Sequence, residues 1–180
     1  MSDFSDLISA IGTAATAVVA FLAYRSAPKW LHTKLRENGY EHVSSLVKEY
    51  DQIILNIRKK HPELKRTYST DLNYGPLKDH IELQKFQLIS LASKFDSCGR
   101  WGIQPPKEYR NHLNHLNSYQ ITAKQVLYGN KIDIMSAEGA EKNNKLRESY
   151  NQKLDDLLVS ILQDEIYYQQ DINQVFKFPK

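Results

Sequence analysis

The pattern that comes nearest to a metal site places His112 and His115 after Glu108, in the second half of the chain. Side chains three or four positions apart share one face of a helix, so these groups would project together. A di-iron bundle, however, needs Glu-x-x-His on two helices, and this pattern is absent from the sequence. The flanking Leu113 and Leu116 indicate the edge of an apolar face. We expect no metal and no cofactor.

Other catalytic patterns are also missing. The sequence contains no phosphate-binding glycine loop, no G-x-S-x-G elbow and no H-E-x-x-H pair. Its single cysteine, Cys98, excludes an intramolecular disulfide and fits a reducing compartment. A nucleophilic cysteine needs a neighbouring base, whereas residues 95–100 resemble a helix end. The acidic pairs at 155–156 and 164–165 are expected on a solvated face. We therefore expect that the protein is not an enzyme.

The strongest local charge feature is a basic cluster in the first third of the chain, formed by Arg58, Lys59, Lys60, Lys65 and Arg66. At the end of a helix, such bases complement the helix dipole. The alternative is contact with an anion, which would be an anionic lipid, a nucleotide-like signal or nucleic acid. The net charge of +3 is too small to favour nucleic acid, which is not an expected partner.

The elements that would position these groups are helices. Apolar residues at helical spacing predict helices at about 40–60, 76–97, 106–129 and 137–176. The first of them has a heptad seam formed by Val43, Leu46, Tyr50, Ile53 and Ile57. Asn38-Gly39 is expected to break the chain before this helix, and Pro62 to end it. The last helix either breaks near residues 163–165 or projects past its neighbours. The sequence predicts an all-α protein with an antiparallel bundle of about four helices.

An uncharged stretch of 18 residues runs from Leu7 to Tyr24 before these helices. Its helical length of about 27 Å approaches the roughly 30 Å of a bilayer core, and it is interpreted as a transmembrane span. Asp3 and Asp6 precede it without any base, which argues against a cleaved signal peptide. The remaining alternative is a buried core or subunit-contact helix, although the stretch carries only small hydroxyls as polar groups.

The flanking charges predict an orientation for this span. Basic and aromatic residues follow it and are expected at the membrane interface, in contact with membrane lipid: Arg25, Lys29, Trp30, Lys34 and Arg36. The chain would then be a single-pass protein of the inner membrane, with its N-terminus outside and its C-terminal domain in the cytoplasm. Within the span, Gly12, Thr16 and Ala20 recur every four residues, which favours helix–helix contact in lipid.

The predicted organisation has three parts, which are a span at 1–27, a basic and aromatic segment at 28–38 and a bundle at 39–180. This layout resembles that of small bacterial and phage proteins with one N-terminal span and a cytoplasmic helical domain, without a motif that identifies a family. The leading hypothesis is a membrane-anchored interaction module that forms homo-oligomers or binds an unidentified protein. One alternative is a membrane-perturbing effector, and another is a helical protein whose N-terminal helix is a core or subunit-contact element.

Overall fold

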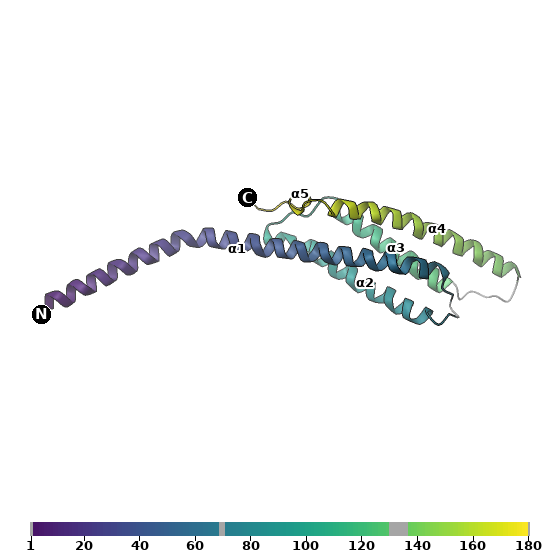
Figure 1. The fold of residues 1–180 in the computed structure, drawn as a ribbon, viewed down its shortest axis with the longest axis horizontal. Coiled ribbons are helices and arrows are strands. Elements are labelled where there is room, and N and C mark those ends of the chain that lie inside the picture. The colour runs from purple at the N-terminus through teal and green to yellow at the C-terminus, as the bar shows by residue number, and fades with distance from the viewer. Residues whose placement is uncertain (1, 69–70, 130–136, 180) are drawn as a thin grey trace.

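The computed structural model describes residues 2–68, 71–129 and 137–179, with side chains in 15–68, 71–128 and 141–179. These ranges form an all-helical protein, which confirms the predicted class. The elements are α1 (Ser2–Arg66), α2 (Tyr74–Ser97), the 3-10 helix η1 (Cys98–Trp101), α3 (Tyr109–Gly129), α4 (Ala137–Tyr168) and α5 (Ile172–Val175). Helices α1 to α4 run alternately back and forth as a bundle, and the N-terminal half of α1 projects from one end of it (Figure 1).

The core of the bundle lies along the heptad seam of α1. All five predicted seam residues are buried, with Val43, Leu46 and Tyr50 fully inaccessible to solvent. They pack among apolar side chains of the other three long helices, which include Leu91, Phe95, Leu116, Ala123, Leu154 and Ile161. The expected seam is therefore confirmed, because a 3–4 spacing keeps these side chains on the one face of α1 that the bundle covers.

The sequence suggested a break at Gly39, but helix α1 continues through this residue without interruption. The glycine serves close packing instead, because a Cβ atom at this position would lie 2.7 Å from Cδ1 of Ile103 in the loop after η1. Both predicted boundaries, at 27/28 and 38/39, fall inside α1. Gly39 is nevertheless the first buried residue of the helix among those described. Pro28 also lies within α1, and a proline there accounts for the bend that Figure 1 shows in its projecting half.

The C-terminal end of α1 continues past Pro62 to Arg66, so the expectation that this proline ends the helix is wrong. The last turn is held by a partner from α4. One guanidinium nitrogen of Arg147 donates hydrogen bonds to the carbonyl of Lys65 at 2.7 Å and to that of Thr67 at 3.4 Å. These contacts satisfy carbonyls that the helix end leaves without intrahelical donors.

Helix α4 ends at Tyr168, three residues beyond the break predicted near 163–165. Tyr168 is 5% exposed and lies at the centre of an aromatic cluster, with ring centroids 4.5 Å from Tyr50 and 6.0 Å from Phe95. After α4 the chain turns through α5, and Phe176 returns into the core. An antiparallel backbone pair between Gln104 and Lys177 then fixes the C-terminal tail beside η1.

The structure corrects the membrane interpretation. Within the described ranges, no helix combines the length and the apolar character that crossing a bilayer requires. The described side chains of the stretch are those of residues 15–24, and α1 continues beyond Tyr24 through Arg25 and Lys29. The predicted location in the inner membrane, with the N-terminus outside and the domain in the cytoplasm, is therefore contradicted. Leu7 and Gly12 lie outside the described side chains.

Candidate functional site

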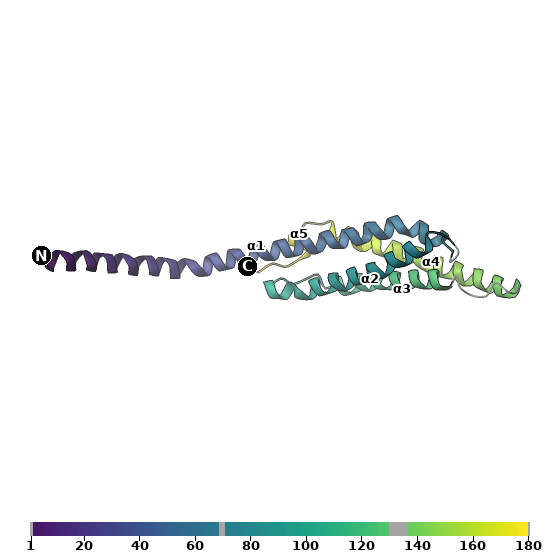
Figure 2. The same ribbon diagram turned by 90° about the horizontal axis from the view of Figure 1, so that it is seen from below.

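The most distinctive surface of the molecule is the projecting part of α1. We call residues 15–38 the free segment, because every residue in this range is exposed and the first buried one is Gly39. Figure 2 shows that none of the other labelled helices runs beside most of this part of α1. The free segment carries eight exposed large apolar or aromatic residues, which are Val18, Val19, Phe21, Leu22, Tyr24, Trp30, Leu31 and Leu35. Clusters of this kind on a protein surface mark sites of contact with other molecules.

The electrostatic character of the free segment changes along its length. Residues 15–24 carry no charge, whereas the following turns hold Arg25, Lys29, Lys34 and Arg36. Lys34 donates to Glu37 at 2.7 Å on the helix surface. These basic residues and Trp30, which were predicted at a membrane interface, lie on exposed turns of a helix that leads into the bundle. The free segment is therefore uncharged and apolar at residues 15–24 and basic in the turns that lie closer to the bundle.

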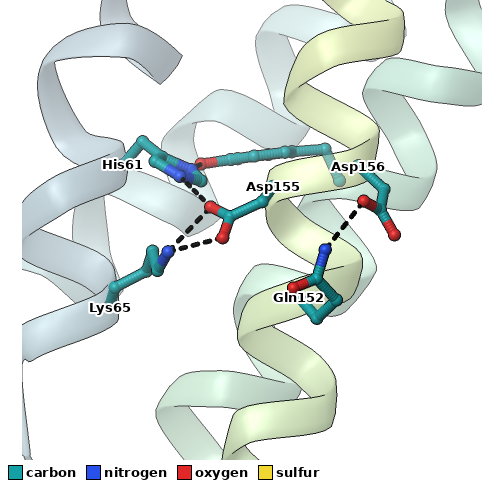
Figure 3. A network of polar contacts seen from close by, with 6 residues as sticks. His61, Lys65, Gln152, Asp155 and Asp156 are labelled. Carbon is teal, nitrogen blue, oxygen red and sulfur yellow. Dashed lines mark hydrogen bonds and ion pairs between the residues drawn. The ribbon is translucent and has the colours of Figure 1, made fainter.

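The free segment emerges from a bundle in which polar contacts lock α1 against α4. In Figure 3, His61 and Lys65 on α1 point toward Asp155 on α4. Nε2 of His61 lies 2.8 Å from Oδ1 of Asp155, and Nζ of Lys65 donates to Oδ1 and Oδ2 at 2.8 and 2.6 Å. Burial acts to raise the pKa of Asp155, but hydrogen bonds from Lys65 and His61 outweigh burial and leave the pKa below its ordinary value.

Both ring nitrogens of His61 have partners. Because the Asp155 carboxylate only accepts hydrogen bonds, Nε2 carries a proton and donates it. In the neutral ring Nδ1 then accepts from the hydroxyl of Tyr119 on α3, at 2.9 Å. His61 is 8% exposed, and its imidazole joins three helices. This arrangement leaves no ring nitrogen for a substrate, so we interpret the group as a clamp that fixes the C-terminal turns of α1 to α3 and α4.

A second polar cluster occupies the end of α4 and explains the two histidines of the sequence pattern. His112 and His115 both approach Asp164, with Nε2 of His112 3.4 Å from Oδ1 and Nδ1 of His115 2.7 Å from Oδ2. Nδ1 of His112 also lies 3.1 Å from the hydroxyl of Tyr168. Burial lowers the pKa of His112, so its neutral form is favoured. Among the described residues, no group of three or more ligating side chains is arranged to hold a metal ion.

The fold divides the basic cluster, for which anion contact was the alternative to a role at the helix end. Three of its members have carboxylate partners: Arg58 pairs with Glu165, Lys60 with Glu63 at 2.7 Å, and Lys65 with Asp155. The other two, Lys59 and Arg66, line an open cleft at the α1–α2 turn together with Glu63 and Asp71. Of the two acidic pairs expected on a solvated face, Asp155, Asp164 and Glu165 bond to α1 or α3, whereas Asp156 is exposed.

A shallow groove runs between α2 and α3 and has an apolar floor that includes Leu88, Ile89 and Leu113, with Lys85 and Arg110 at its rim. Ile89 and Phe86 on α2 are 57% and 65% exposed, because the apolar stripe of α2 is wider than the strip that the bundle covers.

Cys98 lies where α2 meets η1, and its thiol is buried. Burial raises the pKa of this thiol to about 11, so it stays protonated at neutral pH. A protonated, inaccessible thiol is not a nucleophile.

Comparison with models of known protein families, with characterised protein sequences and with solved structures finds no match to this chain. The free segment of α1, presented by a bundle whose polar groups are engaged in internal contacts, is thus the surface on which a functional assignment rests.

Proposed function

We propose that the protein is a helical interaction module in which the bundle presents the free segment of α1 as a contact helix for another protein chain. The observation that carries this proposal is the run of 24 consecutive exposed residues, 15–38, with eight large apolar or aromatic side chains among them. Burying one such side chain gains about 1.5–3 kcal/mol when it is fully covered. An amphipathic or apolar helix of this kind supplies the anchors of helix-mediated recognition.

The bundle supports the proposal as a rigid carrier. The contacts of His61, Lys65 and Arg147 join the end of α1 to α4, and Arg58 pairs with Glu165 on the same helix. A helix that is fixed along residues 39–66 presents its remaining turns in a defined direction, which reduces the conformational entropy lost on binding. The proposal involves no catalytic step, and the absence of enzymatic activity remains a prediction.

The test is site-specific photocrosslinking of the full-length chain in the cells that express it. A benzophenone amino acid replaces Phe21 in the free segment or, as a matched control, Leu55 on an exposed face of the same helix within the bundle. We expect a protein adduct from position 21 and none from position 55. Absence of any protein adduct at position 21, with normal expression and folding, would refute the proposed function.

A further inference from the structure

The groove between α2 and α3 extends equally far along both helices. It is lined by residues within 85–92 of α2 and within 110–117 of α3, and we call it the α2–α3 groove. Each of these ranges forms two helical turns, with an axial length of about 10 Å. The groove is open to solvent and has a volume of about 380 Å³, which lies within the range of ligand pockets.

The floor of the α2–α3 groove is apolar, and the bundle covers it incompletely. Leu88 is 8% exposed and belongs to the core, whereas Ile89 is 57% exposed and Leu113 is partly buried. Covering such side chains is favourable because it removes apolar surface from water. A ligand that fits the groove therefore presents apolar groups to these three residues.

Contacts between α2 and α3 show which ends of the two helices adjoin. Glu82 on α2 binds Lys124 on α3 at 2.7 Å, and the ring of Phe95 stacks on that of Tyr109 with centroids 5.0 Å apart. An early position of α2 thus faces a late position of α3, and a late position faces an early one. The two helices are antiparallel along the groove.

This antiparallel register places Lys85 and Arg110 at opposite ends of the α2–α3 groove. Lys85 lies at the end that Asn117 lines, and Arg110 lies at the end that Ala92 lines. The two cations also stand on opposite walls, since one belongs to α2 and the other to α3. Among the described residues that line the groove, these two are the charged ones, and both are positive.

The acids that interact electrostatically with these cations already have partners. Glu82, which interacts with Lys85, is bound by Lys124. Asp96, which interacts with Arg110, accepts a hydrogen bond from the hydroxyl of Tyr109 at 3.0 Å. Lys85 and Arg110 are both exposed. The groove is thus an apolar strip with a positive charge at each end, and its complement is an apolar strip with a negative charge at each end.

An amphipathic helix matches this complement in length and in charge. Helices that dock in grooves use apolar anchors at positions i, i+3 or i+4, and i+7. Seven positions extend over about 10 Å, which is the length of the α2–α3 groove. Side-chain ridges of an added helix fit between two neighbouring helices by the same rules that pack the bundle. Carboxylates on opposite flanks of the apolar face, two turns apart, would meet Lys85 and Arg110.

We propose that the α2–α3 groove binds an acidic amphipathic helix of a partner protein. The apolar face of that helix lies on the floor of the groove, and a carboxylate at each end pairs with Lys85 or Arg110. The free segment of a second copy is a poor match, because residues 15–36 contain no acid and their basic turns would face both cations. The site uses α2 and α3 alone, so the inference goes beyond the proposed function and is independent of it.

The first test measures binding of a synthetic peptide to the full-length chain by fluorescence anisotropy. The peptide is a labelled amphipathic helix with leucines at positions i, i+3 and i+7 and a glutamate on each flank, at the two ends of this face. A matched peptide carries lysines in place of the glutamates. We expect saturable binding of the acidic peptide at micromolar concentration, roughly tenfold weaker binding of the lysine peptide, and weaker binding of the acidic peptide at high salt.

The second test reverses the charges of the groove. Lys85→Glu with Arg110→Glu should weaken binding of the acidic peptide roughly tenfold and should strengthen binding of the lysine peptide. The matched control is Lys48→Glu with Lys153→Glu, which changes the net charge equally at exposed positions of α1 and α4. This control should leave the preference for the acidic peptide intact. Equal effects of the two double variants would show that only the overall charge matters and would overturn the inference.

The third test concerns the apolar wall. Ile89→Ser should weaken binding of the acidic peptide, whereas Leu83→Ser should not. The two side chains are 57% and 58% exposed on the same helix, but Leu83 lies about 120° around α2 from Ile89 and faces away from the groove. Circular dichroism and urea midpoints establish that the variants keep the fold. A larger effect of Leu83→Ser would place the peptide elsewhere and contradict the proposed site.

The remaining outcomes identify another occupant or none. Absence of binding by the acidic peptide, or equal affinity for both peptides, would overturn the inference. Saturable binding of laurate without binding of the acidic peptide would assign the groove to a small amphiphile and would likewise overturn it. Crosslinking from position 21 probes the free segment and not the groove, so either proposal can fail while the other stands.

Discussion

His61 on α1 and Asp155 on α4, which are 94 positions apart in the sequence, are joined by a contact of 2.8 Å between Nε2 and Oδ1. The same carboxylate receives Lys65, and the same imidazole reaches Tyr119 on α3. One carboxylate thus links the C-terminal turns of the projecting helix to the remainder of the bundle. Four predictions about the bundle follow from its packing and charges.

Asp155→Ala should destabilise the bundle by about 1–2 kcal/mol more than Asp156→Ala. Hydrogen bonds to charged groups contribute about 1.5–3 kcal/mol, and the partly exposed position of Asp155 reduces this amount. Asp156 is the matched control, because it is the next residue of α4, is exposed, and its carboxylate accepts from Gln152 across one turn of the same helix (Figure 3). Both changes alter helix propensity equally, so urea unfolding of the two variants isolates the contacts of Asp155. Equal effects would show that the clamp contributes nothing to stability.

Ile54→Ala should cost about 2–4 kcal/mol, whereas Leu55→Ala on the next position of α1 should cost less than about 1 kcal/mol. Ile54 is fully buried and its truncation leaves a cavity, while Leu55 is 42% exposed. Denaturant midpoints of the two variants provide the measurement. A larger loss for Leu55→Ala would mean that the outer face of α1 is covered in solution.

Stability should decrease as the pH falls below about 6.5. Burial lowers the pKa of both His112 and His80 below the ordinary value of 6.5, so the folded state binds fewer protons than the unfolded chain in this range. The loss of stability begins as the pH reaches the histidine pKa of the unfolded chain, and it continues until the pH reaches the lower pKa of the folded state. Around His112, Asp164 and Glu108 act to raise its pKa and His115 to lower it, but burial dominates.

Urea unfolding between pH 7.5 and 5 measures this dependence of stability on pH. His112→Gln removes one titrating group and should make the slope shallower, and an NMR titration of the His112 ring should give a pKa below 6.5. A ring that protonates above 6.5 in the folded protein would contradict the prediction.

Cys98 should resist thiol reagents in the native protein. With a pKa of about 11 instead of 9.0, the thiolate population near pH 8 falls by about a hundredfold, and burial restricts access further. Ellman's reagent should therefore react slowly with the native chain and rapidly in urea. Native reactivity equal to that of a free cysteine would show that the junction of α2 and η1 opens readily.

Much of the bundle was predictable because helical periodicity is a local signal. The seam from Val43 to Ile57 shows its buried face through its 3–4 spacing, and Leu154 and Ile161 on α4 show the same pattern. Predicted helix boundaries were wrong where tertiary contacts outweigh the local preference of a residue. Gly39 resembled a helix break, but the side chain of Ile103 occupies the space where a Cβ would lie, and the helix continues.

The polar contacts were not predictable in the same way. The acidic residues of α4 were expected in solvent because their partners lie on helices that are distant in the sequence. Glu165 pairs with Arg58 and Asp164 with His115, over separations of 107 and 49 residues. The apolar stretch also gave a misleading signal, since an uncharged helical run alone does not distinguish lipid from a protein partner.

The continuity of α1 has a mechanical consequence. The turns that form the core of the bundle and the turns that extend about 55 Å beyond it belong to one helix, which bends in its projecting half. The turns between Pro28 and Gly39 connect this bend directly to the packed interior, so torsion applied between them would be transmitted to Gly39 and Val43, whereas torsion applied before Pro28 would first act on the bend.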